Sequence, residues 1–448
     1  MAALSWRGAA LLLWLLALWN CLAYRGLYWD GASFLVHMIE GGRFHDGHTA
    51  RAHILWATQW PAVIAIRLGI TDTALLSMAY SVGLFALPTA LYHLALYRVR
   101  NDPPLLAAVL AIIVTVYLAT CFFIVGEFNA AYAAATATAA VALTSREMGW
   151  RDGGILCALG FLCLRSYEAM LYIGPLLAAM TVWIALRHRA GSPLGRLLGL
   201  TAAGFFIGAA IVSFMVTFTV WDNEYYVRVR AAAFDFWQNL QFMIGGATLA
   251  LFTLTIVLRP SWLRTRIPFV MLGVGAVVFA VSPWLREIRE LALLYPPAHY
   301  VSRTAAGALL WLMLAAMWLF VAWTRHRPRL FVLLAEPQVG RRLIAALFGL
   351  LLAASVPDIV LTRMWTEYLD GFRALIVGHK GFVQARDVAF YDWPAKLFRQ
   401  GWSYPPLSLI LRNAPTDAMV MPALEYGEPP LYEPACGIPA LTGYAWRR

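Results

Sequence analysis

Polar side chains of one helical face follow the first apolar run of the chain. Asp30, Ser33, His37 and Glu40 are spaced three, four and three residues apart, so a helix over this stretch would place all four on one side. A carboxylate such as Asp30 could deprotonate or orient an attacking hydroxyl group. His37 could contact an acceptor or ligate a divalent metal ion, and Glu40 could help to hold the substrate.

Asp30 also has a purely structural explanation. Aspartate is a favoured helix N-cap residue, and Asp30 stands where a helix over residues 31–40 would begin. The residue types alone leave the catalytic and the capping interpretation open.

Two further acidic positions interrupt the apolar runs. Glu127 stands in a short turn, where it could cap the helix that follows. Arg165 and Glu168 break a nearly continuous apolar stretch, and charges near membrane depth usually face a cavity or one another. Arg165 is a candidate phosphate clamp because its guanidinium fork matches a phosphate, but its spacing from Glu168 also allows mutual neutralisation.

Other cations could meet the phosphate of a lipid. Arg228, His299 and Arg303 lie in loops that fall on the same predicted side as Asp30. Each also has an ordinary explanation, because arginine side chains at membrane boundaries extend toward lipid headgroups.

The composition predicts that these residues are carried by a membrane protein. The 448 residues are 61% hydrophobic and only 13% charged, about half the charge that a water-soluble surface needs. The net charge of +11 comes largely from arginines dispersed between apolar runs, which is the pattern of membrane topology. This distribution excludes a nucleic-acid-binding protein and a soluble enzyme.

The apolar runs predict an all-α polytopic membrane protein with about eleven transmembrane helices. The segments are 8–24, 73–97, 104–124, 127–145, 152–168, 169–186, 197–220, 240–258, 267–283, 305–323 and 343–361. With this alternation fifteen loop arginines, among them Arg98, Arg187 and Arg342, fall together with Arg7 on one side, which the positive-inside rule makes cytoplasmic. The N-terminus is then cytoplasmic and the C-terminus extracytoplasmic.

The remaining segments are expected on the extracytoplasmic side of a helical bundle formed by residues 1–361. The long first loop, 25–72, is predicted to hold two amphipathic helices, one of them an interfacial helix over residues 54–66. The proline-rich region 362–448 is expected to form a small extracytoplasmic cap of short helices and loops.

The first loop resembles the GT-C superfamily of polytopic membrane glycosyltransferases, which use polyprenyl-phosphate-linked sugars. The similarity rests on Trp29-Asp30-Gly31 just after the first helix, on the stretch that ends at Glu40-Gly41-Gly42, and on the topology. The resemblance implies transfer of a sugar to an extracytoplasmic lipid, glycan or protein acceptor, with Asp30 as the functional first-loop acid. It also implies that Glu127 is a second-loop acid of the catalytic site, which supports the site or a metal ion. Gly31 stands where many members have a second acid. The implied partners are membrane lipids and the lipid-linked donor, and the implied location is a bacterial inner membrane.

A second class of function is a multi-pass transporter or lipid flippase of the cell envelope. Transport favours charges near mid-membrane with access from both sides, whereas here the polar residues gather on one predicted face. A third class of function is an assembly factor for envelope polysaccharide. The first loop of such a factor would have no reason to gather Asp30, His37 and Glu40 on one face.

Overall fold

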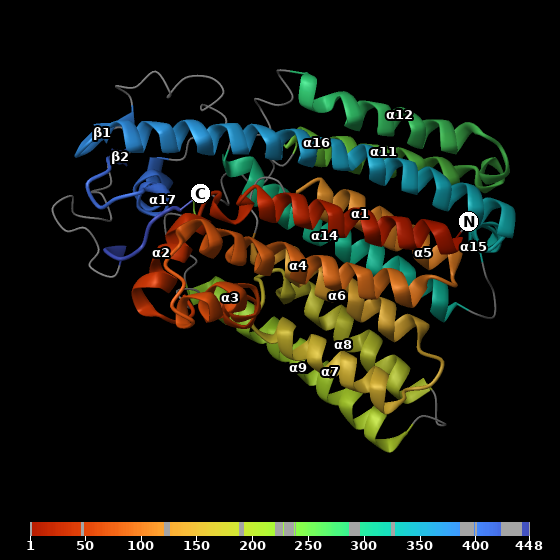
Figure 1. Cartoon of the computed structure of the whole chain (residues 1–448). Helices are drawn as coiled ribbons and strands as arrows, with labels where there is room; N and C mark the ends of the chain where they lie inside the picture. The colour runs from red at the N-terminus through yellow and green to blue at the C-terminus, as the bar shows by residue number, and fades with distance from the viewer. Residues whose placement is uncertain are drawn as a thin grey trace. The chain divides into compact units, whose positions relative to one another are not determined.

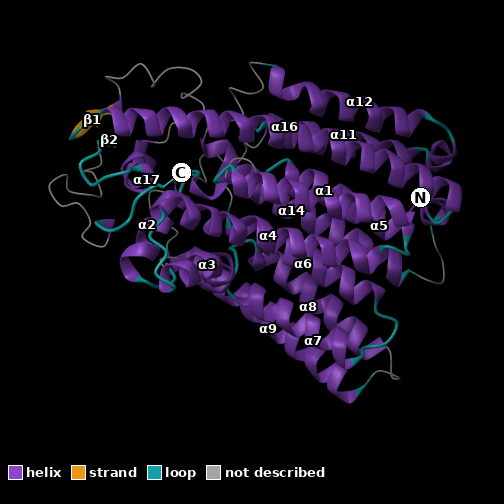
Figure 2. Ribbon diagram, viewed as in Figure 1, coloured by secondary structure: helices purple, strands orange, loops and turns teal. Residues whose placement is uncertain are grey.

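The computed structural model describes most of the chain. The described residues are 2–45, 49–120, 126–187, 192–219, 227, 237, 239–285, 296–323, 328–385, 398, 401–422 and 441–447. Within them the fold is almost wholly helical, with one short pair of strands (Figure 2).

The helices follow one another along the chain as Figure 1 labels them. They are α1 (Ala2–Leu22), α2 (Gly31–Gly41), α3 (Ala52–Arg67), α4 (Thr73–Val99), α5 (Pro103–Ile112), α6 (Glu127–Thr144), α7 (Trp150–Leu164), α8 (Met170–Arg187), α9 (Pro193–Thr219), α11 (Leu240–Leu258), α12 (Ile267–Val281), α14 (Pro296–Ala322), α15 (Arg329–Leu334), α16 (Pro337–Gly378) and α17 (Tyr404–Leu411). The π-helical segment η3 (Ile113–Leu118) extends α5, and single 3-10 turns include η1 (Arg25–Leu27) and η2 (Thr49–Arg51).

The protein is an integral membrane protein by the length and composition of its helices. Eight helices of the described chain are long and apolar enough to cross a bilayer, and each coincides with a predicted segment. The other three predicted segments also form helices, namely α5 with η3, α6 and α7, but these are shorter or less apolar. The total of eleven crossings stays a prediction.

The low hydropathy of α6 has a physical reason. Residues 127–143 of this helix are all buried, and α7, α8 and α14 pack around it. A helix enclosed by protein faces no lipid, so Ala and Thr at close-packed positions can replace the large apolar side chains of a lipid-facing helix.

Close approach between α7 and α9 depends on glycine. A Cβ atom at Gly153 would lie 2.5 Å from the carbonyl oxygen of Gly195, which leaves no room for any side chain. Small residues at such crossings let helix backbones pack closely in membranes, and α7 and α8 both lie along α9.

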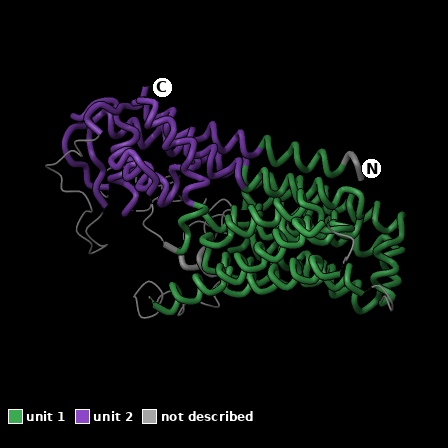
Figure 3. The backbone as a smooth tube through the Cα atoms, turned by 90° about the horizontal axis from the view of Figure 1, so that it is seen from below, with its two compact units in different colours: residues 1–15, 48–54, 88–358 green, residues 16–47, 55–87, 359–448 purple. Residues whose placement is uncertain are grey.

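The chain divides into two compact units, drawn in different colours in Figure 3. Unit 1 contains residues 1–15, 48–54 and 88–358. Unit 2 contains residues 16–47, 55–87 and 359–448, and therefore combines most of the first loop with the C-terminal region. The predicted boundary between bundle and cap, at residues 361 and 362, stays a prediction.

The C-terminal region differs in detail from the predicted short helices and loops. Helix α16 continues to Gly378, well beyond the predicted end at residue 361. A parallel two-stranded sheet follows, in which β1 (Phe382–Gln384) pairs with β2 (Met419–Met421), and α17 precedes β2. The part of this region between residues 386 and 400, apart from Phe398, and residues 423–440 lie outside the described chain.

Candidate active site

A strained turn positions Asp30 in unit 2. Tyr24 and Trp29 have positive φ values of 53° and 60°, a region that non-glycine residues seldom occupy. Between them the buried Arg25 donates hydrogen bonds to Asn20 Oδ1 at 3.3 Å and to Thr362 Oγ1. The packing around residues 24–29 therefore holds the backbone in a conformation that it would not adopt alone.

Gly31 is required by the same turn. A Cβ atom at this position would lie 1.6 Å from the carbonyl oxygen of Gly26, so only glycine fits. The Gly26 amide is itself fixed by Ser81 Oγ at 3.0 Å. Any side chain at position 31 would therefore require this turn to rearrange.

Asp30 occupies the N-cap position of α2 but makes no side-chain capping hydrogen bond. Its side chain is exposed, as are those of His37 and Glu40, while Leu35 and Met38 on the other side are buried. The predicted amphipathic helix is confirmed, and Gly42, with φ 59°, ends it. The capping explanation of Asp30 is not supported by this geometry, because the capping contact is not made.

His37 is hydrogen-bonded within its own helix on this face. Its Nδ1–H donates to the carbonyl oxygen of Ser33 at 2.7 Å, and its ring lies 4.8 Å from the ring of His45. A neutral imidazole with the proton on Nδ1 presents Nε2 as an acceptor. His37 is therefore suited to accept a hydrogen bond from a hydroxyl group.

A second polar cluster lies in unit 1, where a first-loop arginine meets two predicted acids. Arg51, in η2, donates from Nε and Nη2 to Glu168 Oε1 at 3.1 and 2.8 Å. Its Nη1 lies 3.5 Å from Glu127 Oε2. The side chains of Arg51, Glu127 and Glu168 are 17%, 8% and 21% exposed, so the ion pairs are largely shielded from water.

Aromatic rings complete this cluster. The Arg51 guanidinium lies 5.3 Å from the ring centroid of Tyr167, and the buried Arg303 lies 5.3 Å from that of Phe128. The rings of Tyr167 and Phe128 are 6.0 Å apart, and the Tyr132 hydroxyl donates to the carbonyl oxygen of Arg303 at 2.8 Å. Two arginines are thus held beside one aromatic group, each in a cation–π arrangement.

Glu168 is charged in this cluster, and two buried acceptor atoms there make no hydrogen bond to the described residues. Burial acts to raise the pKa of Glu168, but the charge and hydrogen bonds of Arg51, with the charge of Arg303, lower that pKa below its ordinary value. Glu168 is therefore ionised at neutral pH. Its Oε2 and the Oδ1 of Asn129 are buried and lack hydrogen-bond partners among the described residues. Buried acceptors of this kind usually bind water, an ion or a ligand.

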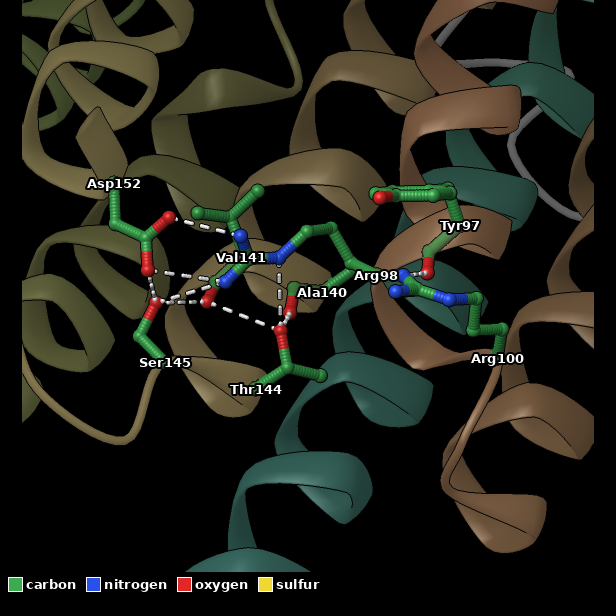
Figure 4. Close-up of polar contacts among 8 residues, drawn as sticks. All are labelled: Tyr97, Arg98, Arg100, Ala140, Val141, Thr144, Ser145 and Asp152. Carbon is green, nitrogen blue, oxygen red and sulfur yellow. Dashed lines mark hydrogen bonds and ion pairs between the residues drawn. The ribbon is translucent and has the colours of Figure 1, made fainter.

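The opposite end of α6 carries a polar cluster in which the groups satisfy one another (Figure 4). Arg98 binds both oxygens of Asp152 at 2.8 and 3.1 Å, and its remaining contacts are Thr144 Oγ1 and Ser145 Oγ, each at 3.1 Å. Ser145 also donates to Asp152 at 2.6 Å. This arrangement ties α4, α6 and α7 together and has the character of a structural clamp.

The structure brings together Glu127, Glu168 and Arg303 of the predicted site residues. Arg165, half-buried, contributes its carbonyl oxygen, which accepts a hydrogen bond from the His53 amide at 3.0 Å. Arg228 lies outside the described residues, and for His299 only its place in the backbone of α14 is described. Asp30, His37 and Glu40 belong to the other compact unit.

Arg51 was missed by the sequence analysis. Two acids at the ends of apolar runs require a counter-charge, and the first loop, already expected on the same side, contains Arg51. The need for a counter-charge to these two acids is the feature of the sequence that could have predicted a role for Arg51. No group of three or more His, Cys, Asp or Glu side chains placed to hold a metal ion occurs in the part of the chain that the structure describes.

Comparisons with protein-family models, with curated proteins and with solved structures found no match to this chain.

Proposed function

We propose that the protein is a membrane glycosyltransferase of the GT-C type, which moves a sugar from a polyprenyl-phosphate donor to an extracytoplasmic lipid, glycan or protein acceptor. The observation that carries the proposal is the state of Asp30. This carboxylate follows the first membrane helix on a strained turn, is exposed, and does not cap the helix at whose N-terminus it stands. Strained backbone of this kind clusters at functional sites.

The chemistry assigned to this face is deprotonation or orientation of the acceptor hydroxyl by Asp30. His37 and Glu40, on the same exposed face, are assigned to the acceptor. The proposal includes a bacterial inner-membrane location, a cytoplasmic N-terminus and an extracytoplasmic C-terminus.

The test uses the full chain in lipid nanodiscs with a panel of radiolabelled polyprenyl-phosphate sugars and an envelope extract as acceptor pool. Asp30→Asn is expected to lower transfer by at least about 100-fold, the low end for loss of a general base. Asp370→Asn removes another exposed aspartate of the same unit, on α16, and is expected to leave transfer unchanged. Full transfer by Asp30→Asn would eliminate the proposed base, and lipid translocation without transfer by the wild type would favour the flippase alternative.

A further inference from the structure

The C-terminal part of unit 2 contains a cavity of about 730 Å³ with a polar lining. It lies beside the β1–β2 pair and the end of α17, and its charged and hydroxyl-bearing residues are Lys380, Ser408, Arg412, Thr416 and Asp417. None of these residues belongs to the transfer site proposed above.

Arg412 is the least expected residue of this lining. It is only 6% exposed, and its Nη2 donates to the carbonyl oxygen of Leu441 at 3.2 Å. Its buried Nε has no hydrogen-bond partner in the described chain. A buried donor on a charged group is costly unless it is hydrogen-bonded, so an unmatched one in a cavity wall points to a bound water, ion or ligand.

Lys380 supplies a second cation, whose ammonium group can still donate a hydrogen bond. Its Nζ donates to Thr416 Oγ1 at 3.2 Å and to Asp417 Oδ1 at 3.0 Å, which leaves one of the three ammonium hydrogens. The Lys380 side chain is 65% exposed and can therefore turn toward an arriving group.

Asp417 does not offset both cations. Its Oδ2 accepts from the backbone amides of Asn413 and Ala414 at 2.8 and 2.9 Å, and its Oδ1 accepts from Lys380. Two cations and one carboxylate leave a net charge of +1 in the lining. The free donors and the excess charge both favour an anion.

We propose that this cavity binds the oxyanion group, phosphate or carboxylate, of a ligand, with Arg412 as the inner and Lys380 as the outer contact. The planar fork of arginine and the mobile ammonium of lysine are the two side chains that proteins use for such groups. The inference does not depend on sugar transfer, because it involves neither Asp30 nor the Arg51 cluster.

Calorimetric titration of the full chain, in nanodiscs of zwitterionic phosphatidylcholine, tests the site with inorganic phosphate and with glucuronate as probes. The wild type is expected to bind at least one probe saturably. Lys380→Gln is expected to weaken that binding about tenfold, as for loss of one charge-assisted hydrogen bond, and Arg412→Gln to abolish it.

Two controls separate this site from general charge effects and from the transfer site. Arg363→Gln removes a 77% exposed arginine of the same unit and should leave probe binding unchanged, as should Asp30→Asn. Lys380→Gln keeps the test valid if Arg412→Gln does not fold, since Lys380 is exposed. Absence of binding by the wild type for both probes, or unchanged binding by Lys380→Gln, would overturn the proposal.

Discussion

At the scale of single residues, Arg51 is the counter-charge of two acids. Its guanidinium neutralises Glu168 directly and Glu127 at longer range, in an environment where each side chain is at most 21% exposed. Removing one partner of a shielded pair leaves the other charge desolvated and uncompensated, and this is more damaging than the net contribution of the pair suggests.

Arg51→Gln is therefore expected to destabilise the protein by about 2 kcal/mol, less than for a fully buried pair because the group is partly exposed. Arg51→Lys keeps the charge but not the guanidinium fork, so its unfolding temperature should lie between those of the wild type and Arg51→Gln. Thermal unfolding in detergent measures the effect, with Arg363→Gln as the exposed control. Equal unfolding temperatures for Arg51→Gln and the wild type would show that the cluster contributes nothing to stability.

The same ion pair makes the stability of the protein depend on pH. The pKa of Glu168 in the folded protein is lowered below its ordinary value of 4.5. The ionised form thus contributes stability that is fully present above the unfolded-state pKa and is lost as the pH falls through the folded-state pKa. As the pH falls below about 5, the unfolding temperature of Glu168→Gln should fall less steeply than that of the wild type. Parallel curves of unfolding temperature against pH for the two proteins would contradict the lowered pKa of Glu168. Glu367→Gln, which removes a 56% exposed glutamate, is the matched control.

At the scale of elements, the junction between η1 and α2 is the most constrained part of the first loop. Two glycines of α2 and its C-cap provide a contrast. Gly31 has no room for a Cβ atom beside Gly26, whereas Gly42 has a positive φ but open space around it.

Gly31→Ala is expected to displace the turn that holds Asp30, and Gly42→Ala to cost only about 1 kcal/mol of left-handed backbone strain. Amide hydrogen exchange over residues 24–41 should rise strongly in Gly31→Ala and slightly in Gly42→Ala. Transfer activity should follow the same order. Identical exchange in the two variants would mean that the close contact with Gly26 does not hold the turn.

The elements also show what the sequence could and could not predict. The amphipathic helix after Asp30 and its glycine end were predicted because period and cap are local properties. The continuation of α16 to Gly378 was not, because hydropathy falls after residue 361. Trp365, Tyr368 and Phe372 there sustain a helical face that packs within unit 2: the Trp365 and Tyr368 rings stack at 5.3 Å. The pairing of Arg51 with two distant acids required the tertiary fold.

At the scale of the whole molecule, the number of crossings determines the sides of the two termini. Eight long apolar helices are present among the described residues, and α5 with η3, α6 and α7 decide whether the total is even or odd. Eleven crossings place the termini on opposite sides of the membrane, whereas an even total places them together.

Terminal epitope tags on the full chain distinguish these arrangements in right-side-out vesicles. The C-terminal tag is expected to be accessible to an impermeant protease, and the N-terminal tag only after permeabilisation, as the arginine distribution predicts. Equal accessibility of both tags would contradict the odd count and would require one or all three of the short segments not to span.

The length of α16 determines how far from the membrane the residues after Gly378 can lie. Its 42 residues span about 63 Å at 1.5 Å per residue, roughly twice the hydrocarbon thickness of a bilayer. If the apolar stretch over residues 343–361 crosses the membrane, residues 362–378 form a spacer that reaches about 25 Å past it. In that arrangement the far end of the spacer, where Lys380 begins the polar cavity, would lie outside the headgroup layer and within reach of water-soluble molecules.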